Sequence, residues 1–301
     1  MLRTVTAGLD GSRESRAAAE WAAREAGLRG LPLEIVHVRK PVPQPGAQPP
    51  LLGAETRQQW SEQTAREAAE GLRLRHPGVE VHIGQVSGDP ADALAEAAGN
   101  AEMLVLGSRG LGGLRGFVVG SVGLSVIAHA DRPVVLVRAL EVAADEHEPD
   151  PAGVPSAATP FLPVVLGLDV EHPDGTLIDF AFDAARRRGT PLRIVHGWNT
   201  PPYHAYGTPA DPALHEALAD AHAEALADAV RPWRHKHADV EVVEASRHGS
   251  AAVHVVDAAR TASLVVVGRR VRDGRPGAHI GHVTHAVLHH SAAPVAVVPH
   301  R

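Results

Sequence analysis

The stretch that decides the fold is MLVLGSRGLGGLRGFVVGSVG, residues 103–123. It opens with four apolar residues, continues with Gly107-Ser108-Arg109-Gly110, and reaches Gly120-Ser121 after nine further residues. This order is typical of a strand, a glycine-rich loop and the start of a helix. Glycines let backbone N–H groups approach a ligand closely, and a helix N-terminus favours anions. The pattern G-x2-G-x9-G-S therefore favours a phosphate site, with a loop that merely contains glycines as the alternative.

The motifs of the chain occur twice, in the same order. Four blocks recur 159 or 161 positions further on: residues 5–10 as 164–169, 35–37 as 194–196, 104–107 as 265–268, and 132–137 as 293–298. A period this long indicates a duplicated domain rather than a solenoid, whose units span about 20–50 residues. We therefore expect one domain at residues 1–140 and a second at 164–301. Residues 141–163 are rich in Pro, Ala and acidic side chains, which is typical of a linker that cannot fold alone.

Within each half, apolar runs alternate with helical segments. In the first half we expect strands at residues 2–9, 33–38, 79–86, 103–107 and 133–138, and helices at 12–29, 54–75, 90–99 and 120–130. The strands are continuous Val, Ile and Leu runs, as in sheets covered on both faces. The alternation predicts an α/β fold with parallel sheets. In such sheets ligands bind beyond the carboxyl ends of the strands, where Asp10 and Gly107 are expected.

Composition narrows the class of protein. The 301 residues are 44% apolar, which is enough for two domains with cores of their own. A net charge of −6 and 3% aromatic residues argue against a nucleic-acid partner. The absence of cysteine excludes disulfides, thiol catalysis and Cys-bound zinc, and fits a cytoplasmic protein. The sequence has neither a signal peptide nor a membrane-length apolar stretch, so we expect no membrane partner.

These residues together resemble the universal stress protein family in its tandem form. The resemblance is carried by Gly8-Leu9-Asp10-Gly11-Ser12 with Ser15, by Val36-His37-Val38, by the G-x2-G-x9-G-S motif, and by residues 133–137. It covers both halves outside the linker. It implies that each domain is a Rossmann-like, five-stranded parallel sheet of order 3-2-1-4-5 flanked by helices, a fold that in this family often binds ATP.

The resemblance also implies roles for individual residues in the first domain. Asp10 would hydrogen-bond the ribose or adenine, and Val38 would present its backbone to the adenine. Gly107, Arg109 and Gly110 would wrap the phosphates, and Gly120, Ser121 and Val122 would offer N–H groups at a helix N-terminus. Taken singly, Asp10 is as typical of a helix cap or turn, and Ser121 of an N-cap. The expected ligand is ATP or another adenine nucleotide, with or without Mg²⁺.

The second half departs from this pattern. Gly268 is kept, but Val271 stands where the second glycine is expected, and His282 replaces the serine. Valine resists positive φ. Glu171 and Asp174 would repel phosphate, while four nearby arginines could attract it, namely Arg269, Arg270, Arg272 and Arg275. We therefore expect the nucleotide in the first domain.

Histidine is concentrated after the linker, where 15 of the 20 histidines lie. His282, His285 and His289 would share one face of a helix because of their i, i+3, i+7 spacing. Such a face could bind a metal or respond to acid pH, and the alternatives are a polar solvent face or the lining of a diverged pocket. No carboxylate or cysteine stands at ligand spacing, so we expect no metal site.

Three functions fit these observations. The first is a nucleotide-binding regulator in a stress response, with at most weak hydrolysis. The second is an ATP-using enzyme of a related α/β fold, and the third is a scaffold whose sites have decayed. Turnover needs a base, Mg²⁺ ligands and a charge-stabilising Lys or Arg, whereas the chain's only lysines are Lys40 and Lys236. The sequence therefore favours binding over catalysis.

The last strand of each half has an apolar residue at nearly every position. An exposed edge of that kind invites aggregation unless it is paired or covered. We expect residues 133–137 and 294–298 to pair in an intramolecular pseudo-dimer, with a homodimer of tandem chains as the alternative.

Overall fold

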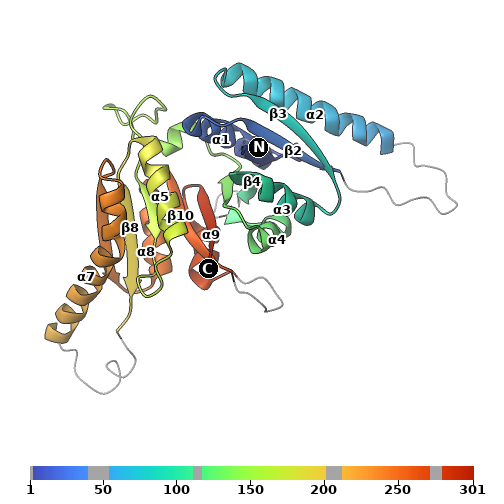
Figure 1. Cartoon of the computed structure of the whole chain (residues 1–301). Coiled ribbons are helices and arrows are strands. Elements are labelled where there is room, and N and C mark those ends of the chain that lie inside the picture. Colours follow the sequence, from blue (N-terminus) through green and yellow to red (C-terminus); the bar gives the residue numbers. More distant parts are fainter. Residues whose placement is uncertain (1–2, 40–53, 111–116, 201–211, 272–279) are drawn as a thin grey trace. The chain divides into compact units, whose positions relative to one another are not determined.

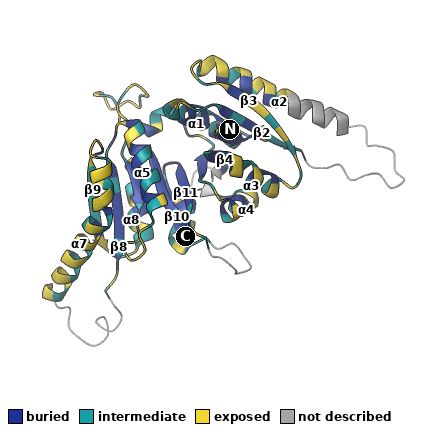
Figure 2. Ribbon diagram, viewed as in Figure 1, coloured by how far each residue is buried: buried dark blue, intermediate teal, exposed yellow. Residues whose placement is uncertain are grey.

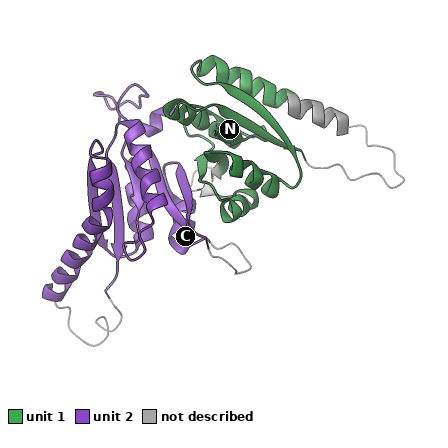
Figure 3. Cartoon of the chain, viewed as in Figure 1, with its two compact units in different colours: residues 1–142 green, residues 143–301 purple. Residues whose placement is uncertain are grey.

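The computed structural model describes residues 3–39, 54–110, 117–200, 212–271 and 280–301, with side chains left out at 54–62, 109–110 and 117–118. The chain divides into two compact units, residues 1–142 and 143–301 (Figure 3). Among the described helices, none is both long enough and apolar enough to cross a bilayer.

The first unit alternates strands and helices as the sequence predicts (Figure 1). Its strands are β1 (Val5–Gly8), β2 (Leu33–Arg39), β3 (Val81–Ser87), β4 (Met103–Gly110), β5 (Phe117–Val118) and β6 (Val134–Arg138). Its helices are α1 (Arg13–Arg29), α2 (Ala54–Arg75), α3 (Pro90–Asn100) and α4 (Ser121–His129).

The parallel sheet of the first unit has the order β3-β2-β1-β4-β6, which confirms the predicted 3-2-1-4-5 arrangement. Helices α1 and α2 cover one face, and α3 and α4 cover the other. Because β1 lies in the centre, it is buried along its whole length, whereas the edge strand β3 has exposed positions (Figure 2). Chain order reverses between β1 and β4, so their carboxyl ends form the switch point where ligands bind in this class of sheet.

The second unit repeats the architecture. Its strands are β7 (Val164–Gly167), β8 (Leu192–Trp198), β9 (Val242–His248), β10 (Leu264–Arg270) and β11 (Val295–His300), in the order β9-β8-β7-β10-β11. Helices α5 (Gly175–Arg188) and α7 (Pro212–Lys236) pack together, and α8 (Ala251–Ala258) packs with α9 (His282–His290). The two units therefore share one topology.

The first helix of each unit begins and ends for the same reasons. Ser12 caps α1 by accepting a hydrogen bond from the Ser15 N–H at 3.1 Å, and Asp174 caps α5 in the same manner. Gly30 and Gly189 end these helices in the left-handed region, with φ of 62° and 59°.

The segment predicted to be a linker folds back on itself in the structure. A short 3-10 turn spans Ala143–Glu146. The Leu162 N–H then donates to the Glu146 carbonyl at 2.9 Å, and the Glu148 N–H donates to Pro160 at 2.9 Å. Backbone hydrogen bonds, rather than apolar burial, close this loop.

Candidate ligand-binding sites

The loop after β1 is held in a fixed turn at the switch point. Gly11 has φ of +84°, which favours glycine. The Asp10 carboxylate accepts a hydrogen bond from the Ser12 N–H at 3.0 Å, and the Asp10 N–H donates to Ser15 Oγ at 3.3 Å. From the neighbouring strand, His37 Nδ1 lies 2.8 Å from the Leu9 carbonyl oxygen. These bonds present the exposed Asp10 carboxylate at the carboxyl end of β1.

The charge of Asp10 suits a donor-bearing ligand. Partial burial by itself would raise the pKa of Asp10, but hydrogen bonds from Ser12 and Ser15 outweigh it and hold the pKa below the ordinary value. Asp10 is therefore ionised at neutral pH and can only accept hydrogen bonds. It can receive ribose hydroxyls or an exocyclic amine, and it would repel a phosphate.

The backbone of Val38 is turned toward the open end of β1. The Val36 carbonyl accepts from Leu9, on the β1 side, while the Arg39 carbonyl accepts from Gly88, on the β3 side. Alternate residues of a strand face the same neighbour, so Val38 points its N–H and C=O groups toward β1. Because β1 ends at Gly8, no β1 residue is paired with Val38, and these groups can meet the edge of a planar base.

Gly107 is required by packing, a reason that sequence analysis missed. A Cβ added at Gly107 would lie 2.3 Å from the backbone carbon of Glu14 and 2.7 Å from the Ser15 nitrogen. Glycine thus lets the first turn of α1 lie directly against β4. The predicted contact of Gly107 with phosphate is a separate role and stays a prediction.

Arg109 and Gly110 belong to β4, which continues beyond the predicted end at Gly107. They pair antiparallel with Val118 and Phe117 of the two-residue strand β5. The described ends of the glycine-rich motif therefore pair with each other. Residues 111–116 and the Arg109 side chain lie outside the described part of the chain, so the predicted contact of Arg109 with phosphate stays a prediction.

The N-terminus of α4 is uncapped and exposed. Gly120 occupies the N-cap position without a side-chain hydrogen bond to the first turn. A Cβ added at Gly120 would meet no atom within 4 Å, and Ser121 and Val122 are both exposed. The first N–H groups of a helix have no partner within it, so the helix itself leaves donors at Gly120–Val122 for the predicted phosphate contacts.

The second unit contains a cavity of about 920 Å³ at the corresponding switch point. Its walls come from the ends of β7, β8 and β10 and from the first turn of α9. Gly197, the counterpart of Val38, leaves no room for a side chain because a Cβ would lie 2.4 Å from the Cα of Ala251. Despite the altered motif, this unit has room for a ligand as large as a nucleotide.

Five imidazoles line this cavity, from His172, His196, His282, His285 and His300. His196 repeats the role of His37, since its Nδ1 lies 3.2 Å from the Leu168 carbonyl oxygen. The repeated Ile-Val-His block was the sequence signal for this anchor.

His222 of α7 packs against His196. Its Nδ1 lies 3.3 Å from His196 Nε2, and its ring stacks on Trp198 with centroids 4.7 Å apart. Burial, followed by the proximity of His196, lowers the pKa of His222, so its imidazole is neutral at pH 7.

The histidines of α9 lie in different environments. His282 and His285 face the cavity, while His289 packs on His285 with ring centroids 4.5 Å apart. Among the residues described, three metal-binding side chains come within 4.8 Å of one another only at Asp169, Glu171 and His172, all exposed.

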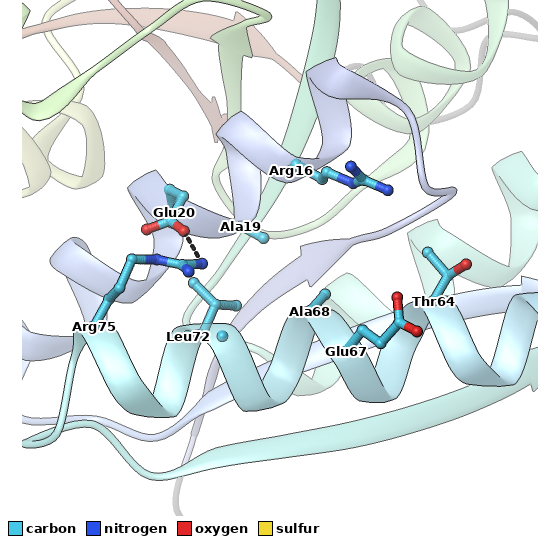
Figure 4. Close-up of a pocket in the computed structure, with 9 residues that line it drawn as sticks. Arg16, Ala19, Glu20, Thr64, Glu67, Ala68, Leu72 and Arg75 are labelled. Atoms are coloured by element: carbon cyan, nitrogen blue, oxygen red, sulfur yellow. Dashed lines mark ion pairs between the residues drawn. The ribbon is translucent and has the colours of Figure 1, made fainter.

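A smaller cleft of about 300 Å³ lies between α1 and α2 (Figure 4). Glu20 bonds to Arg75 and, at 3.0 Å, to His76 Nε2. Burial alone would raise the pKa of Glu20, but these hydrogen bonds hold it below the ordinary value. Glu20, Arg75 and His76 are therefore paired with one another, while Arg16 and Glu67 also line the cleft.

Two Rossmann-like α/β units that share one strand order define a tandem α/β protein. The model of the universal stress protein family matches residues 1–138 and 160–299, and the chain belongs to this family. Two universal stress proteins of Mycobacterium tuberculosis are 33% identical to it over 97% of the chain and 94% and 96% of their own lengths. A universal stress protein structure from Archaeoglobus fulgidus covers 98% of both chains with a TM-score of 0.69 at 15% identity, a likeness of fold.

Proposed function

We propose that this universal stress protein binds an adenine nucleotide, ATP in the first instance, in its first unit and acts as a nucleotide-dependent regulator in a stress response. The observation that supports the proposal is that three complementary groups follow the carboxyl ends of neighbouring strands. They are the ionised Asp10 after β1, the backbone of Val38 near the end of β2, which pairs with no β1 residue, and the N-terminus of α4 after β4 and β5.

These groups match the parts of a nucleotide in order. A carboxylate accepts from ribose hydroxyls, a strand edge pairs with the base, and a helix N-terminus receives phosphate oxygens. The acid at one end and the free N–H groups at the other favour one orientation of the ligand, because Asp10 repels the phosphates. Mg²⁺ would accompany the phosphates rather than the protein.

Binding without appreciable turnover is the form of the proposal that the sequence favours. Phosphoryl transfer requires cationic groups at the transferring phosphate. Lys40 and Lys236 are the only lysines and neither belongs to the glycine motif. Within the motif, the family resemblance assigns Arg109 to the phosphates. A regulator of this kind would report the nucleotide pool by changing which conformation or partner it favours.

Identification of the ligand carried by the purified full-length chain tests the proposal. Denaturation followed by mass spectrometry should release an adenine nucleotide at no more than one per chain, and the Gly120→Val variant should release much less. A valine at Gly120 occupies the space before α4 without touching the fold, since no atom lies within 4 Å of the added Cβ. A different class of ligand, or equal release from the variant, would refute the assignment.

A further inference from the structure

The cavity of the second unit differs from the first site in the side chains at the helix N-terminus, where a phosphate would be expected to bind. In the first unit the helix start is Gly120-Ser121, which carries no titratable group. In the second unit it is Gly281-His282, with His285 on the next turn, and both imidazoles line the cavity. The Thr284 hydroxyl donates to the Gly268 carbonyl at 2.7 Å, which fixes this turn against the end of β10.

Imidazoles outnumber the other ionisable side chains in the described lining of this cavity. Apart from histidines, the charged groups in its described lining are Asp169 and Arg270, whose charges offset each other. Two of the imidazoles have an acid nearby: His172 lies 3.3 Å from Asp169, and His300 lies 3.9 Å from Asp174. No such acid partner is present for His282 or His285 among the described residues.

The elements packed on α9 leave these two imidazoles in a basic environment. Helix α9 carries no acid, and His289 and His290 follow on its last turn. Strand β10 contributes Arg269 and Arg270, and strand β11 contributes His300. Helix α8 carries His254, which contacts the His248 carbonyl, and Asp257, which pairs with Arg260 at 3.3 Å.

We propose that the second unit binds a phosphate-bearing anion in this cavity, held by His282, His285 and the N-terminus of α9, and that binding strengthens as these imidazoles become protonated. Histidine is the side chain that gains its charge between about pH 8 and pH 5. An imidazolium forms charge-assisted hydrogen bonds to phosphate that a neutral ring does not. The first unit would bind its nucleotide at neutral pH, and the second would fill only under acid conditions. The proposal rests on the proposed function for the choice of ATP as a probe.

Proton NMR of the histidine rings in the full-length chain tests the charge coupling directly. Sulfate keeps its charge across this range, so binding at the site must raise the pKa of the imidazoles that hold it. We expect sulfate to raise the pKa of His282 and His285 by roughly half a unit or more, and to leave His290 unchanged. Resonances are assigned with single His→Gln variants. If sulfate did not raise the pKa of His282 and His285, the proposal would be overturned. It would also be overturned if the resonances of these two histidines responded to Zn²⁺ but not to sulfate.

Calorimetric titration with ATP in EDTA gives a second readout, using the Gly120→Val chain to silence the first site. We expect one ATP per chain at pH 5.5 and no measurable binding at pH 7.5, even though ATP itself loses charge on acidification. The H282Q/H285Q pair should lose the acid-dependent affinity, and the matched control H290Q should keep it. Equal affinity at both pH values, or an unaffected double variant, would contradict the proposal. Failure of the wild-type chain to bind ATP at pH 7.5 would count against the first-unit function alone, because the sulfate measurement does not depend on it.

Discussion

Single residues determine which chemical groups the switch point of the first unit presents. Asp10 is exposed, ionised and hydrogen-bonded to the backbone two residues later, so its carboxylate is oriented before any ligand arrives. Asp169 makes the same turn in the second unit, with the Glu171 N–H donating to it at 3.1 Å. The duplication thus supplies a matched control for Asp10.

We predict that Asp10→Asn weakens nucleotide binding by about tenfold, because the amide loses the charge that attracts ribose hydroxyls but still accepts the Ser12 N–H. Asp169→Asn should leave binding at pH 7.5 unchanged.

The lowered pKa of Asp10 means that its carboxylate stays ionised as pH falls and loses its contribution only below its ordinary value of 3.8. First-site affinity should therefore show no Asp10 titration between pH 5 and 8 when measured by calorimetry. An equal loss of affinity in Asp10→Asn and Asp169→Asn would disprove the role assigned to Asp10.

Gly107 and Gly120 belong to one motif, but an added methyl group should destabilise the protein much more at Gly107 than at Gly120. Gly107→Ala places Cβ against the backbone of Glu14 and should cost about 3 kcal/mol of unfolding free energy. Gly120→Ala enters open space and should cost below about 1 kcal/mol, as at other N-caps. Urea unfolding followed by circular dichroism measures both. Similar losses at the two positions would show that the close approach of α1 to β4 is not rigid.

At the scale of elements, the first helix of each unit depends on its terminal glycine. Gly30→Ala forces a left-handed conformation on alanine and should destabilise the first unit by about 1 kcal/mol. Gly189→Ala should do the same in the second unit, since its φ of 59° matches. Thermal unfolding of each variant tests this, and a stabilised variant would contradict the left-handed assignment.

The same elements show which structural features could be predicted from the sequence and which could not. The helix α1 was predicted to begin one residue early and to end where it does, because Ser12 and Gly30 are recognisable caps. The pairing of β4 and β5 was not predicted, since a two-residue strand leaves no periodic signal. The packing role of Gly107 and the size of the second cavity depend on contacts between residues distant in sequence. The predicted binding roles of Asp10, Val38 and Gly120 remain predictions.

At the scale of the whole molecule, the final strands β6 and β11 stand last in the strand order of their own units. Both are apolar and buried over most of their length. We propose that they pair, so that the tandem chain imitates a dimer. A fragment of residues 1–140 should then self-associate, and Val135→Asp should make it monomeric or insoluble. Sedimentation over a wide concentration range tests this, and a soluble, strictly monomeric fragment would rule the pairing out.

The central claim is that one unit of this tandem chain holds a nucleotide at neutral pH. Isothermal titration of the full-length chain with ATP at pH 7.5 tests it most directly, with Gly120→Val measured alongside. We predict a stoichiometry near one per chain and no measurable binding by the variant, which should keep its circular dichroism spectrum. Two equal sites at this pH, no binding at all, or unchanged affinity in Gly120→Val would contradict the account.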